Sequence, residues 1–409
     1  MPSEGSSCAY RHFAAYGAAM YPPPAGTELT VDQARELDDT FLSSDPFQYF
    51  RSRIAALLAW QETAPTGDRP LSEAERGSVR SEFNAYLQRP AVDGPHKELD
   101  VHAQVAVDAL TVRHHAAEAL LRLACVRLAP EAGTGPCCLW AEMATGPRSI
   151  EDVVSRLNNS ANAPNPSERM LRVVIPPGAL EAASRNAEVI DAVNVYVGWL
   201  VYAVDLLCPA QVDVQAANNK VKHGLAVRAR SDMRVAFASQ QPNDDGSVPL
   251  SAFTGDGAID IFDQPVLESL APGPRVDGHR QGLELTQLRL KPAAILAEAF
   301  MLAMTHAAMF HVAAAVHFAG RDDLEEGLGP PDFPGFPVDG PRPKDIEPEA
   351  PLGMRLPEAP LGMRFPLTNP PGGGPVTRQA GIGFRTYFQE LHIDYDNRIH
   401  GQVVDDASV

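Results

Sequence analysis

The segment from residue 98 to residue 128 constrains the fold most strongly, because its apolar residues recur at helical spacing along two neighbouring stripes. The first stripe contains Leu110, His114, Ala117, Leu121, Ala124 and Leu128, and the second contains Val105, Ala109, Val112, Ala116, Ala119, Leu123 and Val126. Two adjacent stripes give a helix a wide apolar face that a bundle must cover. The pattern therefore predicts the central helix of a helical bundle and a mainly α fold class.

Other segments carry helix signals of their own. Thr30 followed by Gln33 resembles a capping box, and Asp45 before Pro46 places a capping carboxylate ahead of a proline at the first helical position. Further helices are predicted over residues 46–63, 72–88, 149–157, 179–208, 211–223 and 292–318. Together these signals predict a helical-bundle domain over residues 28–320.

The pattern changes between residues 225 and 290, where three stretches favour strands. They are residues 225–237, 258–262 and 283–290, and Asn243-Asp244-Asp245-Gly246 is a turn sequence among them. We expect a small β-hairpin or three-stranded insert within the helical domain.

Both ends of the chain lack helical patterning. Residues 330–375 contain fourteen prolines and a tandem Glu-Ala-Pro-Leu-Gly-Met-Arg repeat at 349–355 and 358–364. Such a composition cannot pack a core. The repeat is either a short linear segment that binds a protein partner or a duplication within a linker that has no binding role. The domain plan that follows is an irregular segment at 1–27, a disordered Pro/Gly-rich linker at 321–382 and a short C-terminal segment at 383–409.

The formal net charge of −18 argues against general binding to nucleic acids or anionic lipids, because phosphate contacts need a basic surface. A local basic patch remains compatible with this charge. The cysteines are Cys8, Cys125, Cys137, Cys138 and Cys208. This sparse set has no paired metal-binding spacing, which indicates buried thiols in a reducing compartment.

The N-terminus shows no signal-peptide pattern, and the membrane candidate is the apolar stretch 293–320. That stretch contains Glu298 and His306 among other polar groups. Each such group costs about 2–3 kcal/mol at a bilayer centre. We therefore expect a buried core helix, no membrane contact and a cytoplasmic protein.

A polar constellation lies on the predicted central helix. His114 falls on an apolar stripe, whereas His115, Glu118 and Arg122 share a flanking line on which Glu118 and Arg122 have ion-pair spacing. One interpretation is a polar site with histidine as acid–base group or metal ligand. The other is a hydrogen-bonded core histidine beside a surface ion pair. A dimetal bundle needs Glu-x-x-His on two helices, which is absent, so no metal is expected.

A second constellation, Asn218-Asn219-Lys220-Val221-Lys222-His223-Gly224, ends a predicted helix. Gly224 suits the left-handed conformation that closes helices. The helix dipole favours protonation of His223, and the two neighbouring lysines oppose it. The basic stretch continues with Arg228, Arg230 and Arg234. Residues 220–234 therefore form either a site for a phosphate or another acidic partner, or a helix end decorated with stabilising cations.

Three further histidines lie on the predicted helix at 292–318. His306, His311 and His317 are five and six residues apart, so they cannot share a metal at i,i+4 spacing, and core packing or hydrogen bonding is expected. No cofactor is expected either, because no dinucleotide, phosphate-loop, serine-hydrolase or zinc-protease motif occurs in a suitable context.

The two constellations together resemble the HEPN-like group of helical bundles over residues 98–224. The resemblance rests on the helix sequence His114–Leu123 and on a later helix that ends in Asn-x-x-Lys-His-Gly. In ribonuclease members of that group, an arginine and a histidine separated by four to six residues act at the scissile phosphate, usually across a dimer. His223 matches the histidine, whereas Asn218, Ala217 and Ala216 occupy the three arginine positions. Lys220 and Lys222 cannot fully replace the missing arginine, because a lysine lacks the planar guanidinium group that binds two phosphate oxygens at once.

The leading hypothesis is a non-catalytic HEPN-like protein that binds an acidic ligand or RNA through residues 218–234. Its expected ligand or phosphate contacts are Asn218, Asn219, Lys220, Lys222 and Arg228. The first alternative is a metal-independent, homodimeric ribonuclease of a defence or stress system, with His223 as the acid–base group. The second alternative is an assembly protein whose 330–375 tail recruits a protein partner.

Overall fold

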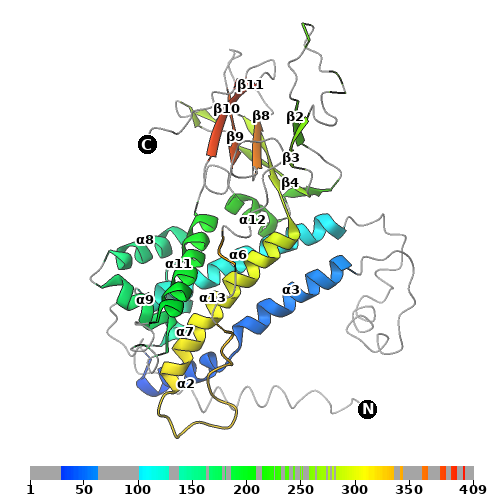
Figure 1. The fold of residues 1–409 in the computed structure, drawn as a ribbon. Coiled ribbons are helices and arrows are strands. Elements are labelled where there is room, and N and C mark those ends of the chain that lie inside the picture. The colour runs from blue at the N-terminus through cyan, green and yellow to red at the C-terminus, as the bar shows by residue number, and fades with distance from the viewer. Residues whose placement is uncertain are drawn as a thin grey trace, which may run out of the picture. The chain divides into compact units, whose positions relative to one another are not determined.

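The computed structural model describes most of the helical part of the chain and scattered parts of the rest (Figure 1). The described residues are 29–62, 101–128, 138–162, 165–176, 180, 186–208, 214–224, 226–231, 282–335 and 341–343, with short stretches between 235 and 280 and strands between 362 and 400. The predicted helix at 72–88, the segment 1–27 and most of the linker at 321–382 lie outside them.

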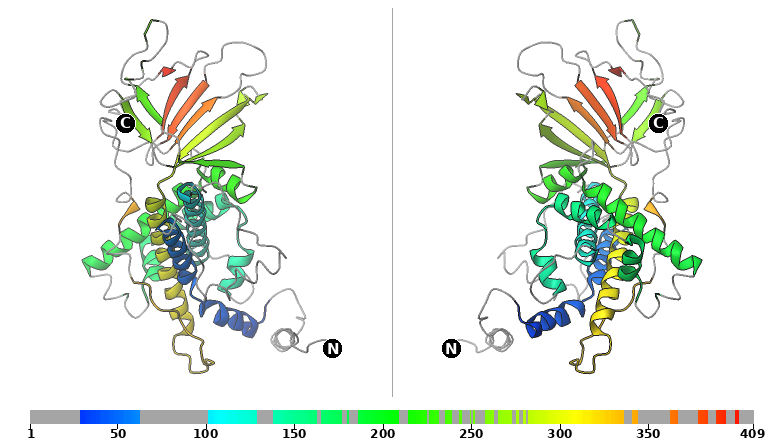
Figure 2. Two further views of the ribbon diagram at one scale, coloured as in Figure 1. Left: turned by 90° about the vertical axis from the view of Figure 1, so that its right-hand side faces the viewer. Right: turned by 90° about the vertical axis from the view of Figure 1, so that its left-hand side faces the viewer.

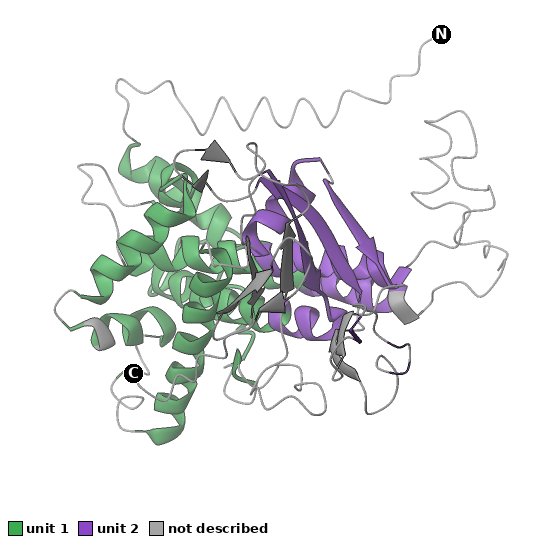
Figure 3. Ribbon diagram, turned by 90° about the horizontal axis from the view of Figure 1, so that it is seen from above, with its two compact units in different colours: residues 1–50, 115–208, 300–345 green, residues 51–114, 209–299, 346–409 purple. Residues whose placement is uncertain are grey.

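The chain divides into two compact units (Figure 3). The first comprises residues 1–50, 115–208 and 300–345, and the second comprises residues 51–114, 209–299 and 346–409. The long helices α3 (Pro46–Glu62), α6 (Val101–Leu128) and α13 (Pro292–Phe318) each contribute to both units.

The first unit is helical in its described residues. Besides parts of the three long helices, it contains α2 (Val31–Leu42), α7 (Leu139–Thr145), α8 (Ile150–Ala161), α9 (Pro166–Val174) and α11 (Ala187–Leu207). The predicted capping box at Thr30 and Gln33 is present, and the Asp45 carboxylate accepts hydrogen bonds from two backbone N–H groups that open α3. The core includes Leu120, Leu121, Leu123, Trp199 and Phe310, all buried.

The second unit combines helices with an antiparallel sheet. Besides parts of the three long helices, its described residues include α12 (Val214–Lys222). The insert strands β1 (Val227–Arg230), β4 (Val266–Pro272) and β7 (Leu283–Arg289) lie side by side in that order, which confirms a small β insert in this part of the chain. The strands at both edges of this trio were predicted, whereas the predicted strand at 258–262 pairs in a separate sheet. Two short two-stranded sheets accompany them: β2 (Val235–Ala238) with β3 (Ala258–Phe262), and β5 (Arg275–Val276) with β6 (His279–Arg280).

The C-terminal part of the chain extends this sheet (Figure 2). Strands β8 (Gly362–Pro366), β9 (Arg378–Gly383), β10 (Phe388–Ile393) and β11 (Ile399–His400) follow β7 in sheet order. Composition predicted a linker for residues 321–382, and β8 together with most of β9 lies within that range. Pairing of β8 with β7 explains the difference, because a sheet edge can order a segment that has no core of its own.

Strand β4 was not predicted, although it is the central strand of the insert. Both of its faces mix apolar and polar side chains: Val266 and Glu268 share one, and Leu267 and Ser269 share the other. The strand therefore lacks the simple alternation by which a half-buried strand is recognised.

The predicted wide face of the central helix is buried. Val105, Ala109 and Val112 from one stripe and Leu110, Ala117 and Leu121 from the other are each fully inaccessible to solvent. Packing on both stripes confirms a helical-bundle fold of the mainly α class.

Within the described residues, two helices are long and apolar enough to cross a membrane, Ala187–Leu207 and Pro292–Phe318. The most apolar window of the second is 72% buried, as expected for a core helix, whereas that of the first is only 28% buried. Sequence analysis considered only the second. Cytoplasmic localisation stays a prediction.

Candidate functional site

The end of α12 presents the predicted basic motif to solvent. The last turn closes with a hydrogen bond from the His223 N–H to the Asn219 carbonyl at 2.9 Å, and Gly224 follows with a positive φ of 133°. Glycine adopts this backbone conformation without strain, as predicted for the helix stop. Asn219, Lys222 and His223 are exposed and Lys220 is half-buried. His223 is therefore accessible and not a packed core residue.

The turn at Gly224 leads directly into strand β1. A hydrogen bond of 3.2 Å from the Ala226 N–H to the Lys220 carbonyl holds the start of the strand against the last turn of α12. Arg228 and Arg230 follow on β1, two residues apart and hence on one face of the sheet. Arg228 is exposed and Arg230 is half-buried, whereas Arg234 lies outside the described residues.

Sheet register adds a third arginine to this face. Arg230 pairs with Val266, which pairs in turn with Arg289 on β7, so the three side chains form one row across the sheet. The row beside it contains Arg228, Glu268 and Gln287, and the Gln287 amide donates to the Glu268 carboxylate at 3.0 Å. Arg289 was not among the predicted basic residues, because only the pairing register reveals which side chains share a face.

His114 is a buried, neutral core histidine. Its Nδ1 lies 2.7 Å from the Leu110 carbonyl, which can only accept, so Nδ1 carries the proton and Nε2 is an acceptor. Burial is the main cause of a pKa of His114 lowered to about 3; the charges of Arg113 and Lys222 act in the same direction, and the hydrogen bond to Leu110 opposes them. Because this pKa lies far below 7, His114 is uncharged at pH 7 and offers a ligand no positive charge.

Helix α12 lies near this histidine. The positions of Asn218 and Lys222, one helical turn apart, fall on one side of α12. Asn218 is buried and the charge of Lys222 acts on His114, so this side of α12 faces α6. The Nε2 of His114 and the Oδ1 of Asn218 are buried acceptors without a hydrogen-bond partner among the described residues. The fold therefore brings together the two motifs that carried the family resemblance.

A buried ion pair lies next to His114. Nη1 of Arg113 on α6 donates to Oε2 of Glu298 on α13 at 2.6 Å, and the two side chains are 4% and 0% exposed. Sequence analysis did not predict this pair, since the two residues lie 185 positions apart. The pair and His114 make a polar layer within the apolar stripes of α6.

The rest of the predicted polar cluster has a structural arrangement. Glu118 and Arg122 form the expected ion pair at 2.8 Å, and Arg122 also donates to the Pro147 carbonyl at 2.8 Å. His115 is exposed, with its ring 5.6 Å from that of Tyr49. These contacts join α6 to neighbouring segments of the first unit, in keeping with the interpretation as a surface ion pair.

The three histidines of α13 have separate surroundings. Burial lowers the pKa of His306 to about 4, with a further contribution from the charge of His115. The Nδ1 of His311 lies 2.7 Å from the Pro331 carbonyl, and the Nε2 of His317 lies 2.6 Å from the Asp39 carboxylate. No three histidine, cysteine, aspartate or glutamate side chains gather for a metal ion within the described residues.

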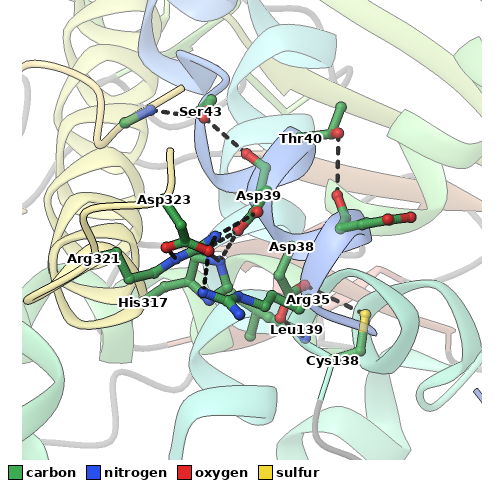
Figure 4. A network of polar contacts seen from close by, with 12 residues as sticks. Arg35, Asp38, Asp39, Thr40, Ser43, Cys138, Leu139, His317, Arg321 and Asp323 are labelled. Carbon is green, nitrogen blue, oxygen red and sulfur yellow. Dashed lines mark hydrogen bonds and ion pairs between the residues drawn. The ribbon is translucent and has the colours of Figure 1, made fainter. Parts of the chain in front are cut away.

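A charged network at α2 was not predicted (Figure 4). Asp39 on α2 receives both terminal nitrogens of Arg321, and Arg321 also bonds to Asp323 at 3.1 Å. Arg35 reaches the same Asp323 at 2.6 Å. A hollow of about 530 Å³ opens beside these groups, lined by Asp32, Arg35, Glu36, Asp39, Thr40, Arg321, Asp323, Glu325 and Leu328. Its arginines are all engaged by carboxylates, so it offers an anion no free cation among its described residues.

Comparison of the chain with protein-family models, with curated proteins and with solved structures finds no match.

Proposed function

We propose that the α12 end and strand β1 bind a phosphate-bearing ligand of the single-stranded RNA type, without cleaving it. The observation that carries the proposal is the exposure of Lys222, His223 and Arg228 on either side of the turn at Gly224. Lys220 lies two residues before Lys222 on the same helix, and the whole group occupies only nine residues of an otherwise acidic chain. A local patch of this kind allows phosphate binding despite a net charge of −18.

The contacts must come from side chains and not from the helix backbone. A helix C-terminus presents carbonyl groups and a partial negative charge, so the backbone of α12 repels a phosphate. The lysines and Arg228 offset this repulsion, and Arg228 supplies the planar fork suited to phosphate oxygens. Glu268 lies directly across the sheet from Arg228 and competes with the ligand for it.

Binding is favoured over cleavage because the arginine expected before His223 is absent. Asn218, which stands at the four-residue spacing, is buried against the helices and does not reach solvent. His114 is neutral and buried, so it adds no second charged group. The exposed His223 therefore acts alone as a hydrogen-bonding group toward the ligand.

The binding test uses the full chain and a short fluorescein-labelled single-stranded RNA, followed by anisotropy. Lys222→Ala/Arg228→Ala removes two phosphate contacts, and we expect about a tenfold or greater loss of affinity together with a shallower salt dependence. Arg172→Ala is the matched control, because Arg172 is a 65% exposed cation in the other unit. Equal affinities for the double variant and the control would contradict the proposed patch.

Cleavage is tested separately by following the labelled RNA on a gel. Wild type and His223→Ala should leave the RNA equally intact over hours in a metal-free buffer. Cleavage by the wild type that disappears in His223→Ala would replace the binding proposal with the ribonuclease alternative.

A further inference from the structure

The chain beyond α13 runs back along the helices of the first unit, and side chains of those helices hold its backbone (Figure 1). The Gly329 N–H donates to the Ser43 hydroxyl at 3.0 Å, and the Pro331 carbonyl lies 2.7 Å from Nδ1 of His311. The Phe333 ring lies tilted against the ring of the same histidine, with the two ring centroids 5.1 Å apart. A proline-rich segment is thus positioned by contacts to α2 and α13 before it reaches α11.

On α11 this segment meets an aromatic shelf, which consists of Gly198, Trp199 and Tyr202. The indole N–H of Trp199 donates to the Pro341 carbonyl at 3.1 Å, across 142 positions of sequence. Trp199 is fully buried, and the Tyr202 ring stands edge-on to it at 5.5 Å. Gly198 has no side chain, and a Cβ placed there would lie 3.7 Å from Cδ of Pro343. The ring of Pro343 therefore packs over the gap that the glycine leaves.

These contacts match the chemistry by which proteins recognise proline-rich segments. A proline has no N–H to donate, so a partner reads its carbonyl oxygen and its ring. Aromatic-lined grooves do this with an indole or phenol donor beside an apolar surface, and the stiffness of the proline segment keeps the entropic cost low. The shelf holds Pro341-Arg342-Pro343 in the same way, through the carbonyl of Pro341 and the ring of Pro343.

The contact is small enough to be exchangeable. A single hydrogen bond contributes about 0.5–1.5 kcal/mol, and Pro341 and Arg342 are themselves exposed. Basic proline segments are also favoured electrostatically by a chain of net charge −18, and the internal segment itself carries the exposed Arg342 between its two prolines.

We propose that the aromatic shelf is a binding site for basic Pro-x-Pro segments, occupied here by the chain's own residues 341–343 as an internal ligand. A partner protein with a Pro-Arg-Pro type segment binds by displacing them. The internal segment acts at an effective concentration of about millimolar because it is tethered, which weakens binding of an external segment correspondingly. The shelf is independent of the proposed RNA-binding patch, which belongs to the other unit.

The test uses the full chain and a labelled peptide of residues 338–346. In Pro341→Ala/Pro343→Ala the internal ligand is weakened, and we expect the peptide to bind at least tenfold more tightly than to wild type. A peptide with both prolines replaced by alanine should not bind either protein. Adding Trp199→Phe to the double variant should abolish binding, with unchanged circular dichroism as the check that the helices persist.

Two results would overturn the proposal. The first is a folded double variant that does not bind the peptide, or binds it equally well after Trp199→Phe. The second is loss of cooperative unfolding in the double variant. A displaceable internal ligand is not needed for folding, so this loss would show that residues 341–343 are an essential part of the fold.

Discussion

At the scale of single residues, this protein keeps several polar groups away from water in otherwise apolar helices. His114, Arg113 and Glu298 are buried within one layer, and Asn218 on α12 is buried as well. Burying a polar group costs free energy unless it is hydrogen-bonded, and burying a charge costs much more unless the charge is paired or neutralised. The ion pair and the neutral imidazole are two solutions to that requirement, and both have measurable consequences.

The buried Arg113–Glu298 pair predicts strong asymmetry between single and double variants. Glu298→Ala leaves the Arg113 guanidinium without its carboxylate, and we expect a loss of about 3–5 kcal/mol in the free energy of unfolding. Arg113→Met/Glu298→Met removes both charges and should lie within about 1 kcal/mol of wild type. Urea denaturation measures both, and an equally large loss in the double variant would show that the charges themselves stabilise the fold.

His114 predicts a pH-dependent stability. Its pKa is about 3 in the folded protein and 6.5 as the ordinary value, so between these pH values the unfolded chain binds a proton that the folded chain does not. Stability therefore falls as the pH is lowered from 6.5 toward 4, by at most about 1.4 kcal/mol per pH unit. His114→Gln should flatten the slope of unfolding free energy against pH, and an unchanged slope would contradict a buried neutral imidazole.

At the scale of elements, salt bridges and capping groups tie α2 to segments far away in sequence. Asp38 accepts the Leu139 N–H at 2.9 Å and the Trp140 N–H at 3.0 Å, which caps α7. Its neighbour Asp39 holds Arg321 just after α13. Burial alone would raise the pKa of the Asp39 carboxyl, but the hydrogen bonds from Arg321 and His317 outweigh it and the net shift is downward.

Asp39→Asn tests how much this link contributes. Loss of the charged hydrogen bonds to Arg321 should lower the free energy of unfolding by about 1.5–3 kcal/mol at neutral pH. The pKa of Asp39 is lower in the folded state than in the unfolded chain. The carboxylate therefore stabilises the fold fully above about pH 3.8, and this stabilisation disappears as the pH falls through the lower folded pKa. The gap between wild type and variant should therefore close in acid.

A control for this comparison is Asp322→Asn, which removes the same charge from an exposed neighbouring position. It should change stability by less than about 0.5 kcal/mol. Equal effects from the two substitutions would point to net charge and not to the Asp39–Arg321 link.

At the scale of the whole molecule, the two proposed binding surfaces belong to different units. The phosphate-binding patch lies on α12 and β1 in the second unit, and the aromatic shelf lies on α11 in the first. Both involve segments that stand apart from the general composition: a basic stretch in an acidic chain and a Pro-rich stretch after an apolar helix. An adaptor that joins an RNA-like ligand to a proline-rich protein would use both.

Much of the local helical structure could be predicted from the amino-acid sequence by itself. The stripes of α6, the capping box at Thr30, the proline that opens α13 and the glycine that ends α12 were all predicted, because each depends on neighbours within a few residues. The short-range helix stop at Gly224 also predicted that Lys222 and His223 lie at a helix end. Repeating patterns and caps are short-range, so a single sequence is sufficient for them.

The contacts between groups far apart in the sequence could not be predicted, because they depend on how the whole chain packs. Arg113 bonds to Glu298, Arg321 to Asp39 and Trp199 to Pro341, across 142 to 282 positions of sequence. Strand β4 likewise pairs in its sheet although its sequence shows no clear strand pattern. The tertiary structure also decided that His114 is neutral and that His223 is exposed. Burial and pairing depend on which segments pack together, and that choice is made by the sum of many weak contacts that periodicity does not record.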